Sequence, residues 1–130
     1  MARKDSFHDN AVVAALAPSV ATTAASGAAI DLQGFNSVLF AINTGAVAGD
    51  GDFGVKIQHS NTSTSADFVD APAANVLGDL PATLGENTAY RVGYTGGKRY
   101  ARLALTKGGG TSIAIGAVAV LGEPAIAPAA

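Results

Sequence analysis

The chain has 130 residues, the length of one domain that can bury a core of its own. It has no Cys, which excludes disulfides and thiolate chemistry, and its formal net charge of −2 excludes the basic surface of a nucleic-acid-binding protein. Charged residues are 14% of the chain, against about 25% in an average soluble domain, which indicates a surface that meets other protein more than water. The longest apolar run, residues 113–121, is far shorter than the roughly 20 residues that cross a membrane.

The two ends of the chain differ from its centre. Residues 1–10 are polar and charged and are predicted to form an N-terminal arm, and residues 123–130, with two prolines, are predicted to form an extended tail. Residues 11–122 between them are expected to form one β-sandwich domain. A helix over residues 11–17 is compatible with the Ala-rich composition, but Pro18 and the β-branched residues after it favour extended structure.

From residue 30 onward, apolar residues recur with a period of two, the pattern of half-buried strands. The segments with this pattern are residues 37–43, 53–58, 90–94, 100–106 and 113–121. The last is a long β-branched run with small residues between, which predicts a strand covered on both faces. The predicted core is Val38, Phe40, Ile42, Val55, Ile57, Val92, Leu103, Leu105, Ile113 and Ile115.

Glycine-rich segments separate these strands. The GDGDFG segment, residues 49–54, and the pair Gly96-Gly97 are predicted to form hairpin turns, and Gly108–Gly110 links the last two strands. Residues 61–65 are predicted to form a polar tip.

A looser stretch follows between two prolines, with Val76, Leu77 and Leu80 as predicted buried anchors. Short strands at this spacing, with no convincing helix, predict an all-β fold. We expect an antiparallel β-sandwich of jelly-roll-like form, or a flattened barrel, with extended N- and C-terminal arms. The strand order does not follow from these patterns.

Two loop motifs resemble ligand sites only superficially. The GDGDFG segment matches a dinucleotide fingerprint, but a strand follows it, not the helix whose N-terminus would hold a pyrophosphate. Asp50 and Asp52 could bind calcium, but the twelve-residue calcium-loop pattern is absent and both residues suit a turn. We therefore expect no cofactor and no metal.

The catalytic candidates are equally few. His59 with Asp67 or Asp70 and a serine could form a hydrolytic arrangement, but no nucleophile-elbow string is present. We predict instead that His59 is exposed at a strand end, and we expect no catalytic residue.

Three tyrosines, Tyr90, Tyr94 and Tyr100, lie near arginines and could form a carbohydrate-binding surface. Aromatic residues at a period of two are more typical of a core, with the hydroxyl at its rim.

Three segments carry a resemblance to a known group of proteins. They are residues 29–38 (AIDLQGFNSV), residues 55–60 (VKIQHS) followed by 66–68 (ADF), and residues 92–102 (VGYTGGKRYAR). The pattern, which extends over most of residues 20–120, resembles small structural proteins of tailed bacteriophages. The resemblance implies a non-enzymatic head decoration or cement protein on the outer capsid surface of the virion. Its implied partners are the major capsid protein and further copies of itself, with a trimer favoured, and neither nucleic acid nor a membrane.

The residues expected to make these contacts are basic or lie in the N-terminal arm. Lys98, Arg99 and Arg102 are predicted to form a compact basic patch, for which a solvated hairpin is the alternative interpretation. The arm could become ordered against a neighbouring subunit. The full set of candidate contact residues is Arg3, Lys4, Phe7, Lys98, Arg99 and Arg102. The alternative function is that of a carbohydrate-binding β-sandwich of a phage fibre or tail.

Overall fold

The computed structural model describes residue 7 and residues 10–124, without the side chains of residues 123 and 124. The strands are β1 (Asn10–Ala21), β2 (Ala25–Ser26), β3 (Ile30–Asp31), β4 (Phe35–Ala48), β5 (Asp52–Ser60), β6 (Val69–Asp70), β7 (Val76–Leu77), β8 (Ala89–Tyr94), β9 (Tyr100–Gly109) and β10 (Ser112–Pro124). Two short 3-10 turns, η1 (Ser65–Asp67) and η2 (Ala73–Asn75), are the only helical elements among the described residues. The predicted all-β class is confirmed.

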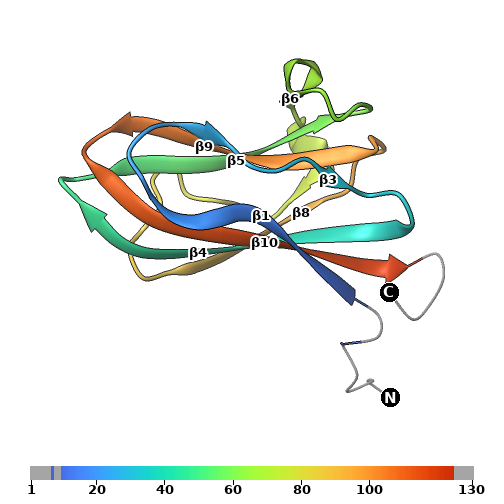
Figure 1. Cartoon of the computed structure of the whole chain (residues 1–130), viewed down its shortest axis with the longest axis horizontal. Helices are drawn as coiled ribbons and strands as arrows, with labels where there is room; N and C mark the ends of the chain where they lie inside the picture. The colour runs from blue at the N-terminus through green and yellow to red at the C-terminus, as the bar shows by residue number, and fades with distance from the viewer. Residues whose placement is uncertain (1–6, 8–9, 125–130) are drawn as a thin grey trace.

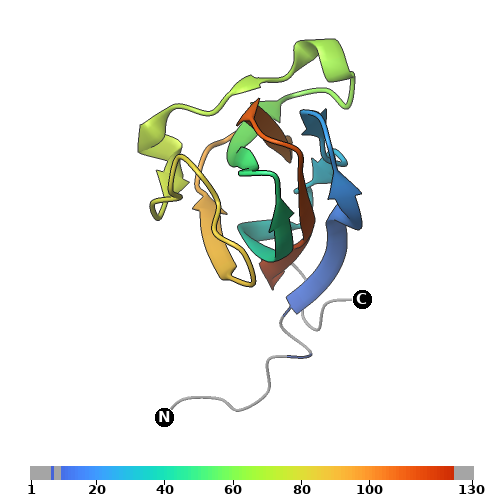
Figure 2. The same ribbon diagram turned by 90° about the vertical axis from the view of Figure 1, so that its left-hand side faces the viewer.

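The strands form two antiparallel sheets that face each other (Figures 1 and 2). The first sheet has the order β1-β10-β4-β8-β7, and Figure 2 shows this order from blue β1 across to β8. The second sheet has the order β2-β9-β5-β6, with β3 also paired to β9. The sheets do not close into a barrel, so the β-sandwich prediction is confirmed over the flattened barrel.

The core lies between the two sheets and follows the period of two. Nine of the ten predicted core side chains are buried, with Phe40, Leu103 and Ile113 completely so. Val55 is the exception, because it is only half-buried, although it packs against the core. It opens onto a hollow of about 340 Å³ beneath residues 71–80, which cover β5 loosely.

The predicted hairpins are wrong in one respect, since the glycine-rich turns join strands of opposite sheets. β4 pairs with β10 and β8, whereas β5 pairs with β9 and β6. The chain reverses tightly at Gly49 and Asp50, whose φ angles are 59° and 55°. The turns at residues 96–97 and 108–110 likewise cross between the sheets. Turn chemistry thus specifies where the chain reverses, but the burial of apolar faces decides which strands pair.

The anchors of the looser stretch also differ from the prediction. Leu77 is 60% exposed, and Val76 and Leu80 are only half-buried. The buried anchor is Leu84, whose N–H donates to the carbonyl of Phe53 at 2.8 Å. This backbone hydrogen bond to β5 holds Leu84, and not an earlier leucine, against the core.

The sandwich is slightly longer at both ends than residues 11–122. Asn10 pairs with Gly122 at the start of β1, and Pro124 pairs with Phe35 at the end of β10. The rest of the predicted arm, apart from Phe7, and residues 125–130 of the predicted tail lie outside the described residues.

Candidate functional site

The predicted contact residues that the structure describes do not all share one environment. Arg3 and Lys4 are outside the described residues, and Phe7 is 82% exposed. Lys98 and Arg99 lie at one end of the sandwich, in the connection between β8 and β9.

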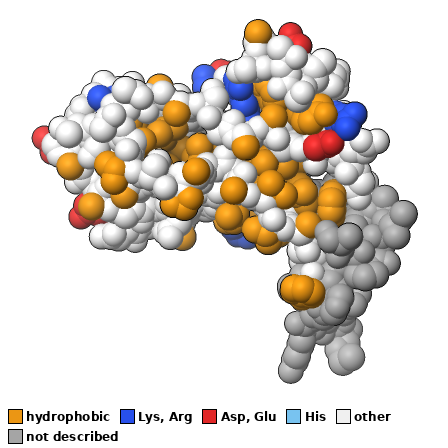
Figure 3. All heavy atoms as spheres, in the orientation of Figure 1, with side chains coloured by type: hydrophobic (Ala, Val, Ile, Leu, Met, Phe, Trp, Pro, Cys, Tyr) orange, Lys and Arg blue, Asp and Glu red, His pale blue; other side chains and the backbone are white. Residues whose placement is uncertain are grey.

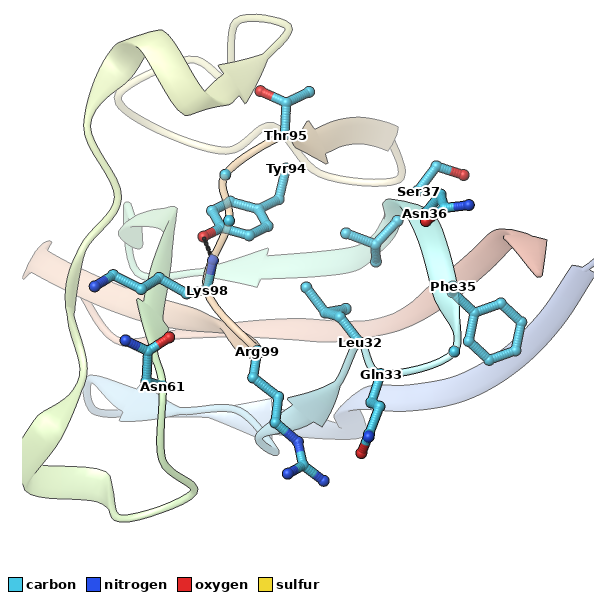
Figure 4. A pocket seen from close by; sticks show the side chains of 14 residues that line it. Leu32, Gln33, Phe35, Asn36, Ser37, Asn61, Tyr94, Thr95, Lys98 and Arg99 are labelled. Atoms are coloured by element: carbon cyan, nitrogen blue, oxygen red, sulfur yellow. Dashed lines mark hydrogen bonds between the residues drawn. The ribbon is translucent and has the colours of Figure 1, made fainter. Parts of the chain in front are cut away.

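Lys98 and Arg99 line an open pocket of about 470 Å³ together with residues 32–38 and Asn61 (Figure 4). The two cations point to different sides. The Arg99 guanidinium donates from Nε and Nη2 to the Asp31 carboxylate at 3.1 and 2.9 Å, and these bonds lower the pKa of Asp31. Lys98 extends toward Asn61 instead. Among the described residues, Lys98 is therefore the cation at this end whose ammonium group forms no ion pair.

The wall of this pocket is built on Tyr94, which is 4% exposed. Its hydroxyl accepts from the Lys98 N–H at 3.2 Å and lies 2.7 Å from Nδ1 of His59. Because the hydroxyl accepts a hydrogen bond from the backbone, it can donate its own proton to the unprotonated Nδ1 of a neutral His59. Burial, with a smaller contribution from the charge of Lys98, lowers the pKa of His59. The predicted exposure of His59 is wrong, since the ring is 7% exposed.

Arg102 differs from the other two basic residues in its burial, since it is only 8% exposed. Its Nε donates to Gln58 at 2.9 Å, its Nη1 donates to Ser65 at 2.8 Å, and its guanidinium lies 4.3 Å from the centre of the Phe68 ring. Residues 61–70 fold back over the outer face of the second sheet and cover Arg102 there. Arg102 therefore does not add to the exposed basic surface of Lys98 and Arg99. The one sequence signal for its burial is the lone Phe68 in a polar segment.

The carboxylates considered for catalysis are bound elsewhere. Asp67 accepts from Thr62 at 2.6 Å, and Asp70 accepts from Gln58 and Lys56 at 3.0 and 3.1 Å. Because His59 contacts Tyr94, these residues do not form a Ser-His-Asp arrangement.

The aspartates considered for calcium have structural positions as well. Asp52 accepts from Thr83 at 2.5 Å, and Asp50 lies in the tight turn. Within the described ranges, no three His, Asp or Glu side chains come together as a metal site would require.

The three tyrosines do not form an exposed platform for a sugar ring. The Tyr90 hydroxyl accepts from Gly85 at 2.8 Å, Tyr94 is buried, and Tyr100 lies under the Arg99 guanidinium at 5.1 Å. The carbohydrate alternative stays a prediction, without a site at these residues.

The feature that sequence reasoning missed is the outer face of the first sheet. Strand register aligns two rows of side chains across it: Leu77, Gly93, Leu39, Val120 and Val12 in the first row, and Arg91, Ala41, Val118 and Ala14 in the second. We call these two rows the apolar face. Arg91 is their one charged residue, and four large side chains are well exposed, namely Val12 (65%), Leu77 (60%), Leu39 (37%) and Val118 (37%).

The surface around β1 is also rich in hydrophobic side chains. Hydrophobic side chains gather where Figure 1 draws β1 and β10, while charged groups lie toward the periphery of the view (Figure 3). A hollow of about 780 Å³ continues the apolar face toward Pro18 and Val20. The prediction that β10 is covered on both faces is therefore wrong for the single chain, because Val118 and Val120 point outward and stay accessible.

Comparison with known protein families, curated proteins and solved structures finds no match. In the part of the chain that the structure describes, no helix has the length and hydropathy needed to cross a lipid bilayer.

Proposed function

We propose that this chain is a non-enzymatic structural protein of a phage virion, which decorates or cements the outer capsid surface as a homo-oligomer through protein–protein contacts. The observation that carries the proposal is the apolar face, where two aligned rows hold a single charge. Contiguous exposed apolar surface of this kind marks a protein–protein contact. The virion and the capsid enter through the resemblance of residues 29–38, 55–68 and 92–102 to small phage structural proteins.

The composition of β10 supports a contact role. Its outward residues include Val118 and Val120, where a solvated strand would carry polar side chains, and its neighbour β1 carries Val12 on the same face. Both faces of β10 carry apolar side chains, but the single chain buries only one of them. This fits a protein that buries the second face when it assembles with other protein chains.

The function is tested on purified particles of the phage that encodes the chain. We expect the chain in a fixed, high ratio to the major capsid protein, and we expect purified chain to rebind particles that lack it. A chain absent from the particles, or present in only a few copies at the tail, would contradict capsid decoration.

A charge variant tests how the capsid is contacted. Lys98→Glu should weaken rebinding, because Lys98 is exposed and its ammonium group is available to an acidic capsid surface. Lys56→Glu is the matched control, since Lys56 lies on the second sheet in an exposed pair with Asp70 that contributes little to stability.

A further inference from the structure

The open pocket that Lys98 lines, at one end of the sandwich, has the size and the mixed lining of a ligand site. Its volume of about 470 Å³ falls inside the roughly 300–1,000 Å³ range of such sites. Its lining comes from residues 32–38, Asn61 and residues 94–99, which are far apart in the sequence. We propose that this pocket binds an acidic saccharide, a sugar ring that carries a carboxylate. The proposal goes beyond capsid decoration and does not depend on it.

Polar side chains lie at two opposite edges of the pocket (Figure 4). Lys98 and Asn61 lie together at one edge, and Asn36 and Ser37 lie together at the other. All four residues are exposed, so a ligand in the pocket can reach them. A sugar ring suits two such edges, because its polar groups extend from its rim.

The floor between these two edges is apolar and held in place. Leu32 and the ring of Tyr94 lie there, and Leu32 is only half-buried, which leaves apolar surface for the C–H face of a sugar ring. The Tyr94 hydroxyl is fixed by the Lys98 N–H at 3.2 Å and by Nδ1 of His59 at 2.7 Å. A floor that is already ordered lowers the entropic cost of binding.

The amide and hydroxyl groups at the edges are available to a ligand. In the described part of the chain, the side chains of Asn36, Ser37 and Asn61 make no hydrogen bond to other residues. An amide side chain both donates and accepts hydrogen bonds, as a sugar hydroxyl does, whereas a carboxylate only accepts. These side chains therefore suit a ligand with several hydroxyl groups better than an isolated acidic group.

The charge of the pocket selects an acidic sugar over a neutral one. Its lining holds two cations, Lys98 and Arg99, and no Asp or Glu. The Arg99 guanidinium is bound to Asp31, but the Lys98 ammonium group has no ion pair among the described residues. A carboxylate on the sugar would form a charge-assisted hydrogen bond with Lys98, beside the Asn61 amide.

Titration of the full chain, followed through its amide resonances, tests the site. The probes are glucuronate, galacturonate and N-acetylneuraminate, which carry a carboxylate on differently arranged hydroxyl groups. We expect at least one of them to shift the resonances of residues 32–38, 61 and 95–99. Glucose and galactose, which lack the carboxylate, should bind about tenfold more weakly, because a hydrogen bond to a charged group contributes about that factor. The absence of shifts at these residues with all three acidic probes would overturn the proposal.

Two variants test the two edges separately. Lys98→Met removes the charge and should raise the dissociation constant of the acidic sugar about tenfold, with no change for the neutral sugar. Asn36→Ala should weaken both sugars alike. The matched controls are Lys56→Met on the second sheet and Asn43→Ala, which lies on β4 like Asn36 but outside the pocket. Equal effects in the variants and their controls would contradict a site in this pocket.

Two further probes distinguish other ligands. Acetate that binds as tightly as the acidic sugars would show that the pocket recognises a carboxylate alone, and the proposal would be wrong. A hexaglutamate peptide that binds these residues more tightly than any sugar would assign the pocket to a contact with protein.

This proposal and capsid decoration can fail separately. A chain that binds an acidic sugar but is absent from phage particles would contradict capsid decoration and support the saccharide site. A chain that is abundant on particles but binds none of the three acidic probes would do the reverse.

Discussion

At the scale of single residues, Gly96 is required where it stands. A Cβ at this position would overlap the ring and hydroxyl of Tyr94, whereas a Cβ at Gly97 would meet nothing within 4 Å. We predict that Gly96→Ala lowers the free energy of unfolding by ~1–3 kcal/mol, because Tyr94 cannot leave its buried site. Gly97→Ala should change it by less than ~0.5 kcal/mol. Urea denaturation of both variants measures the difference, and equal stabilities would show that Tyr94 can move.

His59 links stability to pH. Because burial lowers the pKa of His59, the unfolded chain takes up a proton near its ordinary pKa of about 6.5 while the folded chain resists it. The stabilisation is therefore fully present above pH ~6.5 and is lost as the pH falls below it. Asp31 and Asp70, whose pKa values are also lowered, contribute only at more acidic pH.

The prediction is that urea denaturation finds the native chain less stable at pH 5.5 than at pH 8, and that His59→Gln shows a smaller loss between these pH values. The difference between native chain and variant isolates His59 from the other titrating groups. An identical pH dependence in the two proteins would mean that His59 binds its proton equally well in the folded chain.

At the scale of elements, Arg102 holds residues 61–70 on the second sheet. Its guanidinium bonds to Gln58 and Ser65 and stacks on Phe68, and all of these contacts join β9 to neighbouring segments. We predict that Arg102→Lys, which keeps the charge but loses the planar fork, accelerates amide hydrogen exchange in residues 61–70. Lys98→Ala is the control, because the Lys98 side chain has no such contacts. Unchanged exchange in Arg102→Lys would show that Phe68 alone secures the segment.

The sequence predicts where the strands lie along the chain more completely than it predicts which strands pair with each other. Phe40 and Ile57 are buried as the period of two predicts, because alternation records which side of a strand faces a core. The turns at residues 49–51 and 96–97 were located correctly, but not as hairpins. Pairing depends on contacts between strands far apart in the chain, such as β1 with β10, which no local pattern contains.

At the scale of the whole molecule, the described sandwich begins at Asn10, and residues 1–9 offer little apolar area beyond Phe7. Ordering costs ~1–2 kcal/mol per residue, which the burial of so little apolar area would not offset. We predict that deleting residues 1–9 leaves the melting temperature nearly unchanged and weakens binding to particles. A truncated chain that unfolds would assign the segment to the core, and one that binds normally would remove it from the contact.

The burial of the candidate site residues, like the pairing of the strands, depends on contacts between distant segments that the local sequence pattern does not contain. Arg102 was a plausible surface residue, since an arginine opposite Leu103 and Leu105 on a strand points away from the core. It is buried because residues 61–70 return across the outer face of the second sheet and supply Ser65 and Phe68. Which loop covers which face is a property of the folded chain, and the sequence records it only indirectly.

The sequence by itself determined the all-β class, the five strands that show the period of two and the side of each that enters the core, because these depend on alternation between neighbouring residues. Only the tertiary structure decided the strand order and the burial of Arg102 and His59. It also aligned Leu39 with Val120 and Val12 on one exposed face. That face exists through register between distant strands, and register is set by the packing of the whole sandwich.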